Sequence, residues 1–78
     1  MSEKLVDFLA ERCNLLVSDL RQPENYIRIL SAVRELAPSC FTAEDWSNSL
    51  SYIFGGTLSF EDSESAKDYC VEALLRGI

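Results

Sequence analysis

Apolar residues recur every three or four positions along most of this 78-residue chain, the spacing that is typical of amphipathic α-helices. The pattern predicts four helices, at about residues 3–20, 23–37, 42–54 and 61–76. No stretch with alternating apolar residues has a partner strand elsewhere, so we read 57–60 as a packed loop. We therefore expect an all-α fold, a compact bundle of three to four short amphipathic helices with no persistent sheet, in one domain spanning 1–78.

The helix at 42–54 has the clearest start and stop. Thr42 is placed as its N-cap, and Asp45 is expected to reach back and complete a capping box. Gly55 and Gly56 follow the helix and can take the positive φ of a C-terminal cap. One face is apolar and carries Trp46, Leu50, Ile53 and Phe54. The remaining positions are predicted to form a polar side, made of Ser47, Asn48, Ser49 and Ser51.

The helix predicted at 3–20 has more apolar surface than one seam requires. Its seam consists of Leu5, Leu9, Cys13, Leu16 and Leu20. Phe8 and Leu15 project to one flank of this seam, with Arg12 and Asp19 between and beyond them. Either a neighbouring helix or another chain must cover this half-apolar, half-charged flank. We predict that these four residues form a dimer or partner interface, most simply of a two-fold homodimer.

Two prolines set the ends of the helix predicted at 23–37. Pro23 suits its first position, where a missing N–H has no consequence, and Pro38 stops it. Ile27 falls outside its apolar face and is expected to be exposed.

Charge is unevenly distributed along the chain, whose formal net charge is −6. Residues 1–40 carry six acids against five bases, whereas residues 41–78 carry seven acids against two bases. In the predicted last helix four acids share one angular sector, namely Glu61, Glu64, Asp68 and Glu72. Such a sector is typical of a solvated face that keeps a small protein soluble, and it would also fit a basic partner surface. We predict that these four residues bind a basic partner, such as a nucleic-acid-binding protein whose groove they occupy.

Residues for covalent or metal chemistry are scarce. The chain has three cysteines and no histidine, so it lacks a conventional catalytic triad, an imidazole base and any histidine-based metal site. No Cys-x-x-Cys pair indicates zinc or redox chemistry, and no glycine-rich phosphate loop is present. We therefore expect no catalytic residues, no cofactor and no metal. The absence of a signal peptide, a membrane-spanning run and a lipidation signal favours a cytoplasmic location with reduced thiols.

Three alternatives remain open on the sequence. Cys40 lies beside the start of the 42–54 helix, where its thiol could be activated or modified. Asp62-Ser63 resembles the modified Asp-Ser of small acidic four-helix carrier proteins, although Glu64 follows where an apolar residue is expected. Residues 25–54 could form a helix-turn-helix. Its second helix lacks Arg and Lys, which argues against direct binding of nucleic acid.

These observations predict a small acidic protein-binding module rather than an enzyme. By analogy with small acidic proteins, some of them phage-encoded, it would act as an inhibitor, an adaptor or a nucleic-acid mimic directed at a basic partner. A homodimer is expected, and neither a membrane nor nucleic acid is expected as a partner. The alternatives are a carrier or enzyme accessory protein modified at Ser63 or Cys40, and a helix-turn-helix regulator.

Overall fold

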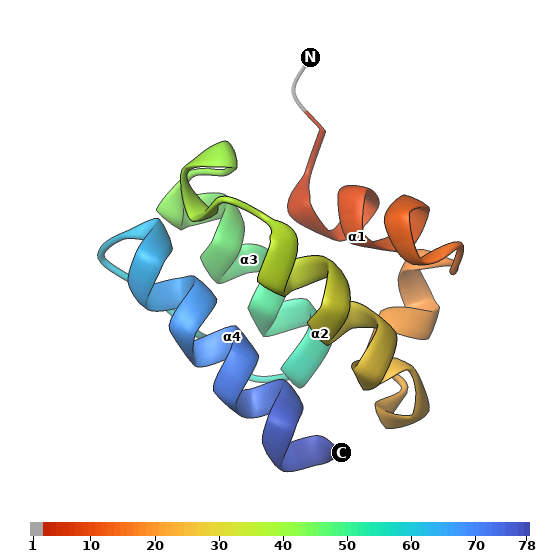
Figure 1. Ribbon diagram of the computed structural model, residues 1–78. Helices are drawn as coiled ribbons and strands as arrows, with labels where there is room; N and C mark the ends of the chain where they lie inside the picture. Colours follow the sequence, from red (N-terminus) through yellow and green to blue (C-terminus); the bar gives the residue numbers. More distant parts are fainter. Residues whose placement is uncertain (1–2) are drawn as a thin grey trace.

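The computed structural model describes residues 3–78, which form helices joined by short connections (Figure 1). The α-helices are α1 (Leu5–Cys13), α2 (Tyr26–Glu35), α3 (Ala43–Phe54) and α4 (Ser63–Gly77). Short 3-10 helices occupy the connections, namely η1 (Val17–Arg21), η2 (Pro23–Asn25) and η3 (Pro38–Cys40). No strand occurs within residues 3–78, and the predicted all-α bundle of short helices is confirmed.

The first helix is shorter than the predicted 3–20, and that prediction is wrong beyond residue 13. α1 ends at Cys13 because Asn14 takes the left-handed conformation, with φ 57°. Asparagine is one of the few residues other than glycine that tolerate this conformation at a helix C-terminus. The N–H of Leu15 then donates to the carbonyl of Ala10 at 2.8 Å, which closes the last turn.

The chain resumes as η1 after this break. Asp19 stabilises the new start, because its Oδ2 accepts a hydrogen bond from the N–H of Leu16 at 3.1 Å. Leu20 in η1 is fully buried in the same core as the apolar residues of α1. The predicted seam is interrupted at Leu16, which is 70% exposed, and resumes at Leu20. The spacing of apolar residues in the sequence does not reveal this interruption, which explains why periodicity alone predicted one long helix.

The predicted second helix at 23–37 forms in two parts. Pro23 begins the 3-10 turn η2, and the α-helical part α2 follows from Tyr26. Ile27 is 63% exposed, as its position outside the apolar face predicted.

α3 begins as predicted, but its capping box is incomplete. Thr42 Oγ1 accepts from the N–H of Asp45 at 3.0 Å. The carboxylate of Asp45 does not return this bond, and its Oδ2 accepts instead from the N–H of Leu5 at 3.0 Å. Asp45 therefore satisfies a free donor at the start of α1 and links two helices. Gly55 and Gly56 end α3 with φ 81° each, as predicted.

The apolar side of α3 anchors the core. Trp46 is fully buried, and its Nε1–H donates to the carbonyl of Pro38 at 2.9 Å. A buried indole therefore keeps a hydrogen-bond partner while contributing a large apolar area. Leu50 and Ile53 are buried on the same side.

The serines of α3 do not form a solvent-facing side, so that prediction is wrong for two of them. Ser47 and Ser49 are buried. The hydroxyl of Ser47 donates to the carbonyl of Ala43, four residues earlier, at 2.8 Å. Ser49 donates to Asp45 Oδ1 at 3.4 Å. A small hydroxyl can be buried because the helix itself supplies its partner.

These serines also hold the segment 57–60 against α3. Ser47 Oγ accepts from the N–H of Phe60 at 3.0 Å, and Ser51 Oγ accepts from the N–H of Leu58 at 2.8 Å. The segment therefore packs as a loop, as predicted, with its backbone donors satisfied by side chains rather than by a strand.

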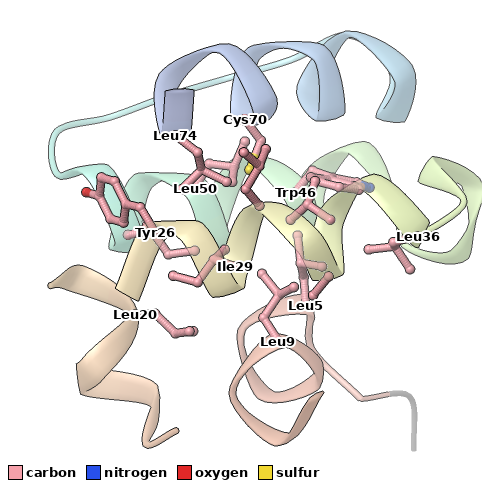
Figure 2. Close-up of a cluster of buried hydrophobic side chains, with 14 of the residues drawn as sticks. Leu5, Leu9, Leu20, Tyr26, Ile29, Leu36, Trp46, Leu50, Cys70 and Leu74 are labelled. Atoms are coloured by element: carbon pink, nitrogen blue, oxygen red, sulfur yellow. The ribbon is translucent and has the colours of Figure 1, made fainter. Parts of the chain in front are cut away.

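The helices form three tiers, which Figure 2 shows in side view. α2 and α3 make the middle tier, with α4 packed on one side and α1 with η1 on the other. Fully buried side chains from every tier meet in one core, among them Leu5, Leu9, Leu20, Ile29, Val33, Trp46, Leu50, Cys70 and Leu74. α1 and α4 therefore present their outer faces in opposite directions.

Candidate functional site

Two side-chain contacts fix the start of α4, the helix that carries the predicted acidic residues. Asp62 is its N-cap, and Asp62 Oδ1 accepts from the N–H of Ser65 at 2.7 Å. This hydrogen bond lowers the pKa of the Asp62 carboxyl because it favours the charged form. Ser63 Oγ donates to the carbonyl of Phe41 at 2.7 Å, which fastens α4 to the loop before α3. Together these contacts fix the rotation of α4 and therefore which residues face outward.

The outer face of α4 carries three of the four predicted acidic residues. Glu64, Asp68 and Glu72 are exposed and follow one another at intervals of four residues, so they line one side of the helix. We call these three residues the acidic ridge. Glu61 does not belong to it, because α4 begins at Ser63 and Glu61 precedes the N-cap. The prediction that Glu61 shares the same helical sector is therefore wrong.

The chain provides little countercharge to the acidic ridge. Lys67, the nearest base in sequence, turns away, and its Nζ donates to the carbonyl of Leu36 at 2.7 Å. It thereby satisfies a carbonyl at the end of α2, where cations are favourable. Arg76 pairs with Glu72 at 2.9 Å. Within residues 3–78, no ion pair forms at Glu64 or Asp68.

The predicted flank of Phe8, Arg12, Leu15 and Asp19 is not one helical face. The break after α1 places Phe8 and Arg12 on α1, while Leu15 lies in the turn and Asp19 in η1. Phe8 and Leu15 are half-buried against the core, and Asp19 accepts the N–H of Leu16. Homodimerisation through these four residues stays a prediction, without a continuous helix to carry it.

A hollow that sequence periodicity did not reveal lies beside Phe8. The rings of Phe8 and Phe41 lie 5.6 Å apart, measured between centroids. Next to them is a hollow of about 370 Å³, whose apolar lining consists of Phe8, Ala32, Leu36, Ala37, Cys40 and Phe41. Arg12 and Glu35 complete the lining and form an exposed ion pair at 3.2 Å. We call this hollow the Phe8–Phe41 groove.

Three separate elements build the Phe8–Phe41 groove, which explains why the sequence did not predict it. Its residues come from α1, from the end of α2 and from the η3 connection. No periodic pattern within one helix joins them. The only available signals were the apolar Phe8 outside the α1 seam and Phe41 before the α3 cap.

The three thiols differ in their surroundings. Cys70 is fully buried in the core, and burial raises the pKa of its thiol to about 12. Cys13 is half-buried, and burial raises the pKa of its thiol despite the opposing effect of Arg28 and Arg12. Cys40 is exposed and lines the Phe8–Phe41 groove.

The side chains considered for carrier or DNA-binding roles have structural contacts. The hydroxyl of Ser63 is half-buried and donates to the Phe41 carbonyl, so it does not project freely as a carrier serine would. In α3, the second helix of the possible helix-turn-helix, Asp45 is bound to the N–H of Leu5, and Glu44 is exposed in the first turn. An acidic helix start repels phosphates.

Within residues 3–78 there is no group of three histidine, cysteine or carboxylate side chains that could hold a metal ion. None of the helices in this described part is both long enough and apolar enough to cross a bilayer. Comparisons with known proteins find no match to this chain among family models, curated sequences or solved structures. The residues of the chain itself therefore carry the functional argument.

Proposed function

We propose that this protein is a small binding module that engages a basic partner protein through the acidic ridge of α4. The observation that carries the proposal is that Glu64 and Asp68 stand exposed on adjacent turns and form no ion pair within residues 3–78. Each pair of like charges four residues apart destabilises a helix by roughly 0.2–0.5 kcal/mol. A cationic partner would relieve this repulsion on binding. The opposite charges of the two surfaces would also speed association and add specificity.

The row of acids in the ridge could imitate part of a nucleic-acid backbone. Its neighbouring carboxylates are four residues apart, or about 6 Å at a rise of 1.5 Å per residue. One DNA strand carries a charge about every 3.4 Å and a duplex one about every 1.7 Å, so the ridge is less densely charged than either. Its charge density is closer to that of a single strand than to that of a duplex. In this proposal it occupies a basic nucleic-acid-binding surface, and the protein acts as an inhibitor or adaptor.

The remaining parts of the proposal follow from the chemistry of the chain. It acts by binding and not by catalysis, since it has no histidine and Cys70 is a buried thiol with a raised pKa. Its place of action is the cytoplasm, where three unpaired thiols would stay reduced.

Affinity capture with matched charge variants tests the proposal. Tagged wild-type protein, a Glu64→Gln/Asp68→Asn variant and a Glu24→Gln/Glu44→Gln variant are each exposed to an extract of the source cells. Both variants change the net charge from −6 to −4, but only the first alters the ridge. We expect a basic protein to be captured by the wild type and the control variant and to be lost from the ridge variant.

Salt dependence provides the second readout of this experiment. Capture through exposed charges weakens when the salt concentration rises from about 0.05 to 0.5 M, because the Debye length shortens. Equal capture by all three proteins, or capture that salt does not change, would contradict the proposal.

A further inference from the structure

The Phe8–Phe41 groove is an apolar surface that residues 3–78 leave partly open. Phe8 and Phe41 are only half-buried although they contact each other and the core. Its volume of about 370 Å³ is at the lower end of the range for ligand pockets, roughly 300–1,000 Å³. A space of this size would accept one or two large apolar side chains.

One hollow beside Arg28 shares Arg12, Ala32 and Glu35 with the groove, and two others adjoin the ring pair. One of these two is lined by Glu3, Phe8, Glu11 and Arg12. The other includes Glu3, Lys4, Cys40 and Phe41. Because these two share Phe8, Arg12, Cys40 and Phe41 with the groove, they form one surface with it around the two rings.

The edge of this surface carries a small excess of acids. Around the groove and the hollows beside it, four acids stand against three bases, namely Glu3, Glu11, Glu35 and Asp45 against Lys4, Arg12 and Arg28, and Arg12 is paired with Glu35. The pKa of the Glu3 carboxyl is raised by local desolvation and, to a lesser extent, by repulsion from Glu11 and Asp7. A second copy of this chain, with its net charge of −6, would bring further acids to this surface, whereas a cationic partner would neutralise them.

We propose that the Phe8–Phe41 groove docks a short amphipathic helix of a partner, with its apolar residues on the ring pair and its Lys or Arg residues at Glu3, Glu11 and Glu35. Helices bind such grooves through apolar residues at i, i+3, i+4 and i+7, which project from one side. The groove shares no residue with the acidic ridge, although η3, which lines part of it, also contacts α4. The two surfaces can therefore be altered separately by substitution.

The probe is a synthetic 14-residue peptide with leucines at helical spacing and lysines on its other face. A peptide of the same composition in scrambled order is the control for charge alone. Fluorescence anisotropy measures both dissociation constants. We expect the amphipathic peptide to bind at least tenfold more tightly, and we expect backbone amide NMR shifts to change around Phe8, Cys40 and Phe41.

Two variants of equal net charge separate the groove from the ridge. Glu11→Gln/Glu35→Gln removes acids at the groove edge and frees Arg12, so we expect the peptide to bind roughly tenfold more weakly. Glu64→Gln/Asp68→Asn removes the same number of charges from the ridge and should change binding less than twofold. Loss of peptide binding in the ridge variant alone would overturn the groove proposal and leave the proposed function standing.

Cys40 allows the groove to be blocked without removing an apolar side chain. A bulky maleimide on Cys40, in a Cys13→Ser background, should abolish peptide binding. In the control, the label is placed on the neighbouring exposed position by Ser39→Cys in a Cys13→Ser/Cys40→Ser background. This labelled protein should bind the peptide normally. Circular dichroism of each labelled protein checks that the fold is kept.

Three further results would overturn this inference. The first is equal binding of the amphipathic and scrambled peptides. The second is unchanged binding after Cys40 is labelled. The third is a peptide-free mass near twice 8.8 kDa in light scattering that labelling of Cys40 returns to 8.8 kDa, which would assign the groove to a second copy of the chain.

Discussion

The serine side of α3 and the acidic ridge of α4 are both polar stripes in the sequence, but the fold treats them in opposite ways. Ser47 and Ser49 are buried, whereas Glu64 and Asp68 are exposed. The difference shows that polarity alone does not predict the surface of a small helical protein. The number of hydrogen bonds that the side chain needs, and their availability within the helix, decides whether it can be buried.

The physical reason is the cost of desolvation. A serine hydroxyl needs about one donor and one acceptor contact, and the helix supplies a carbonyl four residues back. Ser47 uses this contact and also accepts the N–H of Phe60. A carboxylate carries a full charge, and burying it unpaired costs several kcal/mol. The acids of α4 therefore stay in water, where they are available to a partner.

The largest effect is expected when a buried hydroxyl is removed. Ser47→Ala would leave the N–H of Phe60 without its acceptor, and an unsatisfied buried donor costs about 1–3 kcal/mol. Urea unfolding should therefore show a free energy of unfolding lower by that amount. Asn48→Ala, on an exposed neighbouring position of α3, is the control and should change it by less than about 0.5 kcal/mol. Equal effects at the two positions would mean that the buried hydroxyl of Ser47 contributes no more to stability than an exposed polar side chain.

The inner face of α4 provides a test of intermediate size. The folded pKa of Cys70, about 12, lies above its ordinary value of 9.0, so folding favours the neutral thiol. This contribution to stability is complete below pH 9 and is lost as the pH rises from 9 towards 12. Between pH 8 and 10 the free energy of unfolding should fall by about 1 kcal/mol more in the wild type than in Cys70→Ala. Parallel pH profiles for the two proteins would argue against this burial.

The smallest effect is expected on the ridge itself, and its sign is opposite. Asp68→Asn removes two like-charge contacts, with Glu64 and Glu72, so the free energy of unfolding should rise by roughly 0.2–0.5 kcal/mol per contact at low salt. At about 1 M salt the gain should disappear because the charges are screened. Thermal unfolding at the two salt concentrations measures it. A loss of stability in Asp68→Asn would mean that this acid has a structural role.

Much of the fold could be predicted because it depends on local chemistry. The Thr42 cap, the positive φ of Gly55 and Gly56 and the exposure of Ile27 all follow from residue type and spacing. The helix break at Asn14 was missed because the apolar spacing continues through it into Leu20. The residue at the break is an asparagine, and an asparagine can also occupy an exposed helix face, so its left-handed conformation could not be predicted from residue type alone.

The candidate surfaces were predictable to different degrees. The ridge lies on one helix, so its period of four was visible in Glu64, Asp68 and Glu72. Glu61 was misplaced because the Asp62 cap sets the helix start at Ser63, two residues after the predicted start. The Phe8–Phe41 groove depends on tertiary packing of three elements.

The most direct test of the central claim is the dissociation constant of the captured partner, measured by calorimetry with the wild type and with two charge variants. If the acidic ridge is the binding surface, Glu64→Gln/Asp68→Asn should weaken binding roughly tenfold, and Glu24→Gln/Glu44→Gln, of equal net charge, should change it less than twofold. Equal weakening by both variants would mean that overall charge, and not the ridge, attracts the partner. Unchanged binding in the ridge variant would contradict the account.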